Sequence, residues 1–228
     1  VTFVVDEVNM GSYLPYGTYG YWQLVQRRLH IFGDLLRNGQ DIFIIEPDAW
    51  WEQNPMKVID TIEADVVGFE NSNHVFGFGF LRLRSSAVLQ RIWSETEWIV
   101  DTAMGESQPP SSSFVLSAEA HEQIVFSNLL QTSNLTVYTL DDCHFPSGKW
   151  YASVEYRTRC PSPHVIQNNY VVGFEQKKVR AKRWGHWFET CWSEPWSVPY
   201  ATQTIAALPN HRTTPLYNIS LFHLIGAG

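Results

Sequence analysis

Asp41-Ile42-Phe43-Ile44-Ile45-Glu46-Pro47-Asp48 is the stretch that decides the fold class of this chain. It begins as an apolar run of strand length and ends in two carboxylates that stand one residue apart. In an open α/β sheet, ligands gather outside the carboxyl ends of the strands. Hard carboxylate oxygens suit Mg²⁺ or Mn²⁺, whose shell substrate phosphates commonly complete. The stretch therefore predicts a metal and diphosphate site, and the alternative interpretation is an acidic, solvated turn.

The segments on both sides of this stretch predict an α/β sheet. Apolar residues at helical spacing predict a helix over 19–37, which Asn38-Gly39 ends. Strand, helix and strand in succession are typical of this fold class. Further strands are expected over 2–5, 64–69 and 77–84. Further helices are expected over 86–102, 117–130 and 173–183.

The pattern of long apolar-periodic segments ends at about residue 135. From residue 137 onward, short apolar pieces alternate with Pro and Trp. We interpret the chain as one domain over 1–228, with a sheet-and-helix body over 1–135 and a cap over 136–228 that closes over a site. Most of the tryptophans in this cap are expected to be core aromatics rather than platforms for sugars. They are Trp184, Trp187, Trp192 and Trp196.

Composition narrows the classes of function. The 228 residues are 44% hydrophobic, which is enough for a sizeable core. A net charge of -7 argues against nucleic acid as a partner, because proteins that bind its phosphate backbone usually carry a basic excess. No stretch has the roughly 20 consecutive apolar residues of a membrane span. The chain starts inside an expected strand, so we expect a trimmed piece and attachment to a membrane, if any, through a segment absent from it.

The cysteines and the glycosylation motifs give only weak evidence about the cellular compartment of the protein. Cys143, Cys160 and Cys191 form at most one bridge and leave one thiol free. Sequons at Asn134 and Asn218 favour the Golgi lumen or another part of the secretory pathway, but only weakly. A cytoplasmic location is the alternative.

Short motifs follow one another along the chain in a defined order. They are Arg27-Arg28, Leu35-Leu36-Arg37-Asn38-Gly39, Glu46-Pro47-Asp48, Trp50-Trp51, Asn54-Pro55, Gly79-Phe80 with Arg82, Arg84 and Ser85, His121-Glu122-Gln123, Phe145-Pro146-Ser147-Gly148, and Asn168-Asn169-Tyr170-Val171-Val172-Gly173 with Lys177 and Arg180. This order resembles the nucleotide-diphospho-sugar transferase family of GT-A glycosyltransferases, which includes plant rhamnogalacturonan xylosyltransferases. The resemblance spans about 2–188. It implies a GT-A type mixed sheet flanked by helices, with an irregular, aromatic-rich C-terminal cap. On this resemblance, the body over 1–135 would bind the nucleotide sugar, and 136–228 would form the acceptor or cap portion.

The resemblance also implies an activity. A metal-dependent hexosyl- or pentosyltransferase would move a sugar from a nucleoside diphosphate sugar, with UDP as the expected nucleotide, to a hydroxyl of a glycan or another acceptor. Retention at the anomeric carbon is expected. Catalytic roles in orienting the sugar fall to Glu122 and Gln123. The implied donor-binding residues are Arg28, Glu46, Asp48, Lys177, Asn168 and Gly173. The implied ligands of Mn²⁺ or Mg²⁺ are Asp48, Glu46, Gln167 and His164.

Three positions depart from the family pattern. Glu46 replaces an Asp, Gly77 stands where an Asn usually precedes the Gly-Phe pair, and Gln167 replaces a His that would complete the metal shell. These departures motivate a second hypothesis, a catalytically weak pseudoenzyme that binds nucleotide sugars. A glycosidase is disfavoured, because its two carboxyls must lie on opposite sides of the scissile bond. Glu46 and Asp48 instead point the same way from the end of one strand. For Glu122, an ordinary carboxylate in the first turn of a helix is the alternative interpretation.

Overall fold

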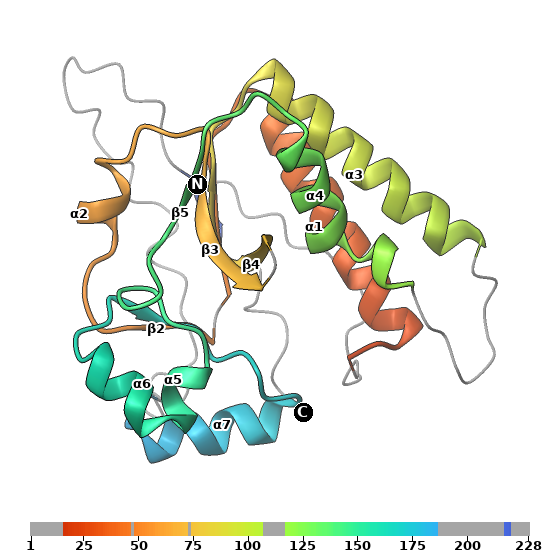
Figure 1. Cartoon of the computed structure of the whole chain (residues 1–228). Coiled ribbons are helices and arrows are strands. Elements are labelled where there is room, and N and C mark those ends of the chain that lie inside the picture. The colour runs from red at the N-terminus through yellow and green to blue at the C-terminus, as the bar shows by residue number, and fades with distance from the viewer. Residues whose placement is uncertain (1–15, 47, 73, 107–116, 187–216, 220–228) are drawn as a thin grey trace, which may run out of the picture.

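The computed structural model describes residues 16–46, 48–72, 74–106, 117–186 and 217–219. Within them, a mixed sheet is flanked by helices, as expected (Figure 1). The strand expected over 2–5 lies outside the described residues, as do Pro47 of the acidic motif and three of the four cap tryptophans.

The main sheet has five strands in the order β5-β3-β4-β1-β7. β4 is antiparallel to both of its neighbours, β1 and β3, whereas β5 is parallel to β3 and β7 is parallel to β1. A second, two-stranded sheet pairs β2 with β6. The strands are β1 (Ile42–Ile45), β2 (Trp50–Trp51), β3 (Val66–Ser72), β4 (Val75–Leu83), β5 (Val137–Thr139), β6 (Val165–Ile166) and β7 (Tyr217–Ile219).

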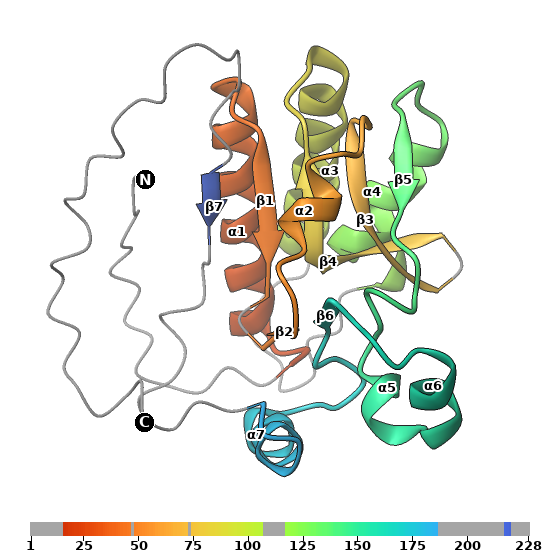
Figure 2. The ribbon, with the colours of Figure 1, turned by 90° about the vertical axis from the view of Figure 1, so that its left-hand side faces the viewer.

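Helices cover the main sheet unequally. The long helices α1 (Tyr19–Arg37), α3 (Ala87–Glu106) and α4 (Glu122–Gln131) lie together on one face, and the short α2 (Met56–Ile59) lies on the other (Figure 1). Figure 2 shows β1 running toward the end of the sheet where β2, β6 and α7 gather. The helices at that end are α5 (Lys149–Ala152), α6 (Val154–Arg159) and α7 (Phe174–Arg183).

The bounds of α1 follow from local sequence signals. The Thr18 side chain accepts a hydrogen bond from the Tyr21 amide at the start of the helix. Asn38 caps the other end, and Gly39 follows with φ +75°, a left-handed conformation that glycine adopts without steric cost. The expected helix over 19–37 is therefore confirmed.

One predicted helix is divided in two. Instead of a continuous helix over 117–130, the structure has a 3-10 turn over Ala118–Ala120, then His121 in an extended conformation, then α4. The break makes Glu122 the first residue of α4, where its carboxylate is buried. Helical spacing of apolar residues did not reveal this break, because it lies between two segments that are each helical.

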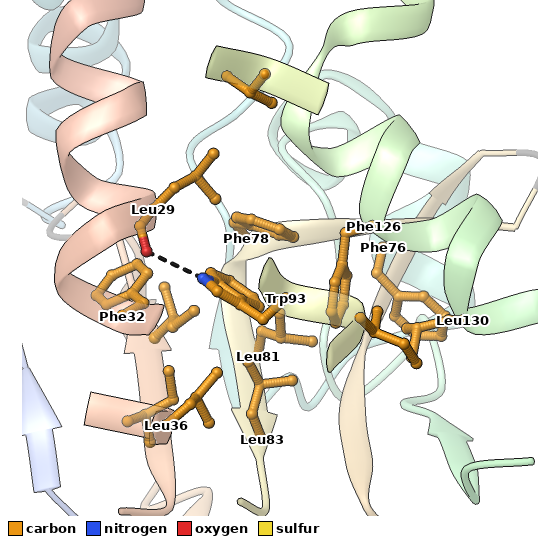
Figure 3. Packing of buried hydrophobic residues seen from close by; sticks show 14 of the residues in the cluster. Leu29, Phe32, Leu36, Phe76, Phe78, Leu81, Leu83, Trp93, Phe126 and Leu130 are labelled. Atoms are coloured by element: carbon orange, nitrogen blue, oxygen red, sulfur yellow. Dashed lines mark hydrogen bonds between the residues drawn. The ribbon is translucent and has the colours of Figure 1, made fainter. Parts of the chain in front are cut away.

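The core between the sheet and the three long helices is built around Trp93 (Figure 3). Its ring packs against Phe32, Phe78 and Phe126, and its indole N–H donates to the Leu29 carbonyl at 3.0 Å. A buried indole N–H without a partner would be costly, so this bond fixes α3 against α1.

The opposite face of the sheet is also buried. Phe43, Val67 and Phe80 point there, whereas Ile42 and Ile44 of β1 point toward Trp93. This alternation within β1 is the expected period of two for a strand covered on both faces. It explains why β1 is an unbroken apolar run in the sequence.

The alternation is interrupted in β4. Phe76 and Phe78 face the Trp93 core, but so do Leu81 and Leu83, which have the opposite parity. The pairing with β3 is irregular here, since Gly68 pairs with Leu81 and Glu70 with Phe76. Extra residues in β4 therefore form a bulge between these pairs, and bulges commonly lie beside functional sites.

Candidate functional site

The acidic motif lies where the sequence places it, directly after β1. The Glu46 amide donates to the Gly79 carbonyl at 2.9 Å, which extends the pairing of β1 with the bulged part of β4. The Ala49 amide then donates to the Glu46 carbonyl and closes a turn that leads into β2. Both carboxylates therefore follow the carboxyl end of a central strand.

Asp48 is paired with a cation from a distant part of the chain. The Lys177 ammonium, on α7, lies 2.6 Å from Asp48 Oδ2. Burial favours the neutral amine, but Asp48 and Glu46 outweigh it and raise the pKa of Lys177 above its ordinary value. The structure thus brings together the carboxylate and the lysine that the sequence analysis assigned to one diphosphate site.

Glu46 stands at the centre of a group of charges. Burial, with smaller contributions from Asp48 and Glu122, raises the pKa of its carboxyl, and Arg28 and Lys177 oppose that rise. The raised pKa therefore reflects chiefly the cost of burying a charged carboxylate. A divalent cation bound beside Glu46 would offset this cost.

Gln167 brings an amide oxygen to the same place. Its Nε2 donates to the Gly79 carbonyl at 3.2 Å, whereas its buried Oε1 has no hydrogen-bond partner. A Cβ on Gly79 would lie 2.6 Å from this oxygen and 3.0 Å from Glu46 Oε2, so glycine leaves room for both. A buried acceptor without a partner, near the Glu46 carboxylate, supplies hard oxygen donors of the kind that suit Mg²⁺ or Mn²⁺.

His164 lies elsewhere. Its ring packs against His144 and Phe145 at the opposite end of β6 from Gln167, and burial lowers its pKa. Among the described residues, the one group of three His, Cys, Asp or Glu ligand atoms within 4.8 Å is Asp142 with the two bridged cysteines. The structure therefore does not bring His164 together with Glu46 and Asp48.

Arg28 and Glu122 form a buried ion pair. Arg28 Nη2 donates to Glu122 Oε1 at 3.1 Å, and the residues are 7% and 1% exposed. His121 Nδ1 lies 3.0 Å from the other carboxylate oxygen. Burial raises the pKa of Glu122, but His121 and Arg28 outweigh burial and hold it below the ordinary value. Arg28 and Glu122 thus lie close enough to Glu46 to affect its pKa, and their opposite charges pair with one another.

Gln123 belongs to a chain of amides. Its Oε1 accepts from Asn71 Nδ2 at 3.3 Å, and its Nε2 donates to Glu122 Oε1 at 3.4 Å. Asn71 Oδ1 accepts in turn from Asn169 Nδ2 at 3.4 Å. Side chains from β3, α4 and the segment before α7 are thereby connected.

The sequence analysis missed Asn71. A Cβ on Gly77 would lie 2.8 Å from Asn71 Nδ2, so the amide from the paired strand fills the space beside the glycine. The sequence carries no local signal for this, because the contact depends on the register between β3 and β4. A side chain at position 77 would therefore displace Asn71 or Phe69, whose Cζ would lie 2.6 Å from the same Cβ.

Arg180 anchors the segment that precedes α7. Its guanidinium donates to Asn168 Oδ1 at 2.7 Å, to the Asn169 carbonyl at 2.7 Å and to the Gly148 carbonyl at 3.3 Å. Asn168 also donates to the Lys177 carbonyl. The two donor-binding candidates Asn168 and Lys177 are therefore held by a residue to which the sequence analysis gave no role.

Gly173 lies at the start of α7 and turns the chain into the helix. Its φ of +94° lies in a region that side chains with a Cβ rarely adopt. Its carbonyl accepts from the Lys177 amide at 3.2 Å, so it begins the turn that carries the lysine. In the described structure, Gly173 therefore positions Lys177 through the backbone turn that begins α7.

The aromatic residues beside the acidic motif point to different sides. The Trp50 ring stacks on His186 at 4.5 Å, whereas Trp51 packs toward Phe80. Neighbouring residues of a strand point to opposite faces, so the two rings cannot both line one site. Trp184 packs against Trp150, as expected of a core aromatic.

Arg82, part of the Gly-Phe motif, has a structural role. Its guanidinium is buried and donates to the carbonyls of Ile59, Ile62 and Ala64. It closes the end of α2 against the sheet. The motif is therefore partly explained by packing.

Cys143 and Cys160 form a disulfide, so Cys191 is the cysteine left over. The bridge joins the segment after β5 to the end of α6. No helix in the described residues is long and apolar enough to span a membrane.

Comparisons with known proteins agree with this geometry. The model of the nucleotide-diphospho-sugar transferase family matches residues 10–78, which include α1, β1 and the acidic motif. The chain is also 25% identical over 187 residues to UDP-D-xylose:L-fucose alpha-1,3-D-xylosyltransferase 3 of Arabidopsis thaliana, which covers 75% of this chain and 49% of that protein. The chain thus spans about half the length of this relative. The mixed sheet and the charges gathered after β1 agree with this similarity to the nucleotide-diphospho-sugar transferase family.

Proposed function

We propose that this chain is the catalytic part of a glycosyltransferase that moves a sugar from a nucleoside diphosphate sugar to a hydroxyl of a glycan. The observation that carries the proposal is the meeting of Asp48, Glu46 and Lys177 at the carboxyl end of β1. Carboxylates for a cation and a lysine for phosphate oxygens are what a diphosphate site needs. The name of the relative includes UDP-D-xylose and L-fucose, so this donor and this acceptor are the first to test.

Asp48, Glu46 and the Gln167 oxygen would hold Mn²⁺ or Mg²⁺. When bound, the ion would neutralise part of the charge that develops on the departing diphosphate. His164 is omitted from this ligand set, because its ring packs with His144 and Phe145.

Lys177 supplies the fixed positive charge. In the structure it neutralises Asp48, and a donor diphosphate would compete for the same ammonium. A cation placed where negative charge develops lowers the barrier more than it stabilises the bound substrate. Arg180 and Asn168 hold the helix that carries Lys177.

Gln123 is the more exposed of the two residues assigned to the donor sugar, whereas Glu122 is buried. We infer that Gln123 contacts the sugar and that Glu122 positions both Gln123 and Arg28. In a retaining transfer, the acceptor oxygen bonds to the anomeric carbon on the face that the diphosphate leaves. The acceptor proton passes to an oxygen of that diphosphate, so no separate carboxylate base is needed.

Binding and turnover of UDP-xylose test the proposal together. Titration calorimetry with UDP is expected to show binding that Mn²⁺ strengthens, and Lys177→Ala is expected to weaken it by about tenfold or more. Lys182→Ala, an exposed lysine on the same helix, is the matched control and is expected to bind as the wild type does. The absence of Mn²⁺-dependent binding of any uridine or guanosine diphosphate would overturn the proposal.

The pseudoenzyme hypothesis differs in turnover. The glutamate at position 46, the glycine at position 77 and the amide at position 167 motivate it. Slow hydrolysis of the donor by the wild type that disappears in Asp48→Asn would exclude it. UDP binding without hydrolysis or transfer of any sugar would instead favour it.

We also propose that the protein resides in the lumen of the Golgi or another secretory compartment. Disulfides persist in oxidising compartments and are rare in the cytosol, and Cys143–Cys160 supports this location. Asn134, the acceptor of the first sequon, is exposed. A mass loss on treatment of the native protein with an N-glycosidase, abolished in Asn134→Gln and Asn218→Gln together, is expected. A reduced, unmodified native protein would favour the cytoplasm.

A further inference from the structure

A cleft of about 540 Å³ opens between the end of β3 and the helices α5 and α6. Asn71, Lys149, Tyr156 and Tyr170 are among its lining residues, and none of the charged residues assigned to the diphosphate is. Its size is within the range of small-molecule sites. The cleft is thus a second space beside the donor site.

Asn71 connects the cleft to the donor site. It lines the cleft, and its side-chain amide donates to Gln123, which the proposed function assigns to the donor sugar. A molecule in the cleft would therefore lie one side chain away from the position of the transferred sugar.

Tyr170 forms one wall of the cleft in an unusual conformation. Its φ is +59°, which a bulky side chain seldom adopts because it costs of the order of 1 kcal/mol or more. Its hydroxyl donates to the Asn71 carbonyl at 3.1 Å, and this bond holds the ring at the cleft. The residue is nevertheless 51% exposed, so burial does not explain the strain.

Lys149 supplies a donor beside that ring. Its ammonium lies 4.6 Å from the centre of the Tyr170 ring. Among the described residues, it has no carboxylate partner. In contrast, the Asp142 carboxylate in the cleft already accepts from Tyr156 and pairs with Arg159.

We propose that this cleft binds the acceptor glycan, with one sugar ring against Tyr170 and its hydroxyls bonded to Lys149 and Asn71. An aromatic face with polar groups around it is suited to a saccharide, which has apolar C–H faces and a polar edge. The inference rests on the proposed function, because only a transferase needs an acceptor beside its donor.

Saturation-transfer NMR on the protein with UDP and Mn²⁺ tests the cleft directly. The probes are L-fucose, D-galactose, L-rhamnose, L-arabinose and D-xylose. At least one is expected to bind the wild type, with affinity reduced by about tenfold in Tyr170→Gly and in Lys149→Ala. Tyr170→Gly keeps the left-handed backbone without strain, and Lys149 is exposed, so both variants are expected to fold.

Tyr138→Ala is the matched control, because Tyr138 is 47% exposed but does not line the cleft. It is expected to bind sugars as the wild type does. Binding of UDP, which tests the proposed function, is expected to stay within about twofold in all three variants. Equal sugar binding in Tyr170→Gly and Lys149→Ala, or no binding of any probe to the wild type, would overturn the assignment of the cleft.

Discussion

Gly79 makes room for Gln167, since a Cβ on residue 79 would lie 2.6 Å from the amide oxygen of Gln167. The same Cβ would lie 3.0 Å from Glu46 Oε2. Gly79→Ala is therefore expected to displace both oxygens and to weaken Mn²⁺-dependent UDP binding by about tenfold. Titration calorimetry with and without Mn²⁺ measures the change.

Gly105→Ala is the control for that substitution. Gly105 lies near the end of α3, and among the described residues no atom beyond its chain neighbours and the backbone of its own helix lies within 4 Å of the position of its Cβ. The alanine is expected to leave UDP binding unchanged and to stabilise the protein by about 0.5–1 kcal/mol. Metal dependence of UDP binding that is unchanged in Gly79→Ala would argue against Glu46 and Gln167 as metal ligands.

Glu122→Gln is expected to lower the free energy of unfolding by about 3 kcal/mol at neutral pH, because it leaves Arg28 buried without a counter-charge. The pKa of Glu122 is lower in the folded protein than its ordinary value of 4.5. The stability that the carboxylate contributes is thus present above pH 4.5 and is lost as the pH falls through the lower, folded pKa.

Urea unfolding of the wild type and of Glu122→Gln from pH 7 to pH 3 checks this prediction. The difference in their free energies of unfolding should be constant at high pH and should shrink at the acidic end. A difference that does not change with pH would show that packing, rather than the charge of Glu122, stabilises this part of the molecule.

Arg82→Leu is expected to destabilise the protein by about 3 kcal/mol or more, because three buried carbonyl oxygens lose their donor. UDP affinity is expected to stay within about twofold when measured below the unfolding transition, since in the described structure the Arg82 side chain bonds to backbone carbonyls at the end of α2 and between α2 and β3. Arg91→Ala, an exposed arginine on α3, is the control for loss of charge. A specific loss of UDP affinity in Arg82→Leu would assign this motif residue to the donor site.

Cys160→Ser is expected to lower the free energy of unfolding by about 2–4 kcal/mol, because the bridge to Cys143 restricts the unfolded chain. Cys191→Ser should unfold as the wild type does under non-reducing conditions. Mass spectrometry of a non-reduced digest identifies the bridged peptides. A peptide that joins Cys191 to either of the other cysteines would contradict the pairing.

Local signals predicted the elements that are long or strongly bounded. Apolar residues at helical spacing and an Asn-Gly stop predicted α1, and two carboxylates after an apolar run predicted the end of β1. The short helices α5 and α6 carry no comparable period, since tertiary contacts such as the Trp150 indole bond to the Cys160 carbonyl hold them in place.

The sequence predicted many of the residues that form the site, but not the hydrogen bonds that hold them together. Asp48 and Lys177 were assigned to one site on a resemblance, and the structure brings them together across 129 residues. Asn71 and Arg180 could not be given roles from the sequence, because their partners depend on strand register and on the packing of α7. His164 lies only three residues from Gln167, yet the direction of β6 carries it away from the carboxylates.

The bulge in β4 sets a rule for changes in chain length. Phe76 and Phe78 on one side of it and Leu81 and Leu83 on the other share a face only because the bulge reverses the parity of the strand. Deleting one residue between Phe78 and Leu81 would give the two pairs the same parity, so they could share a face only if the bulge were lost and β4 paired with β3 as a regular strand. Substitutions are therefore the changes that this segment can accept, whereas insertions and deletions of a single residue would alter the core and the Gly79 site together.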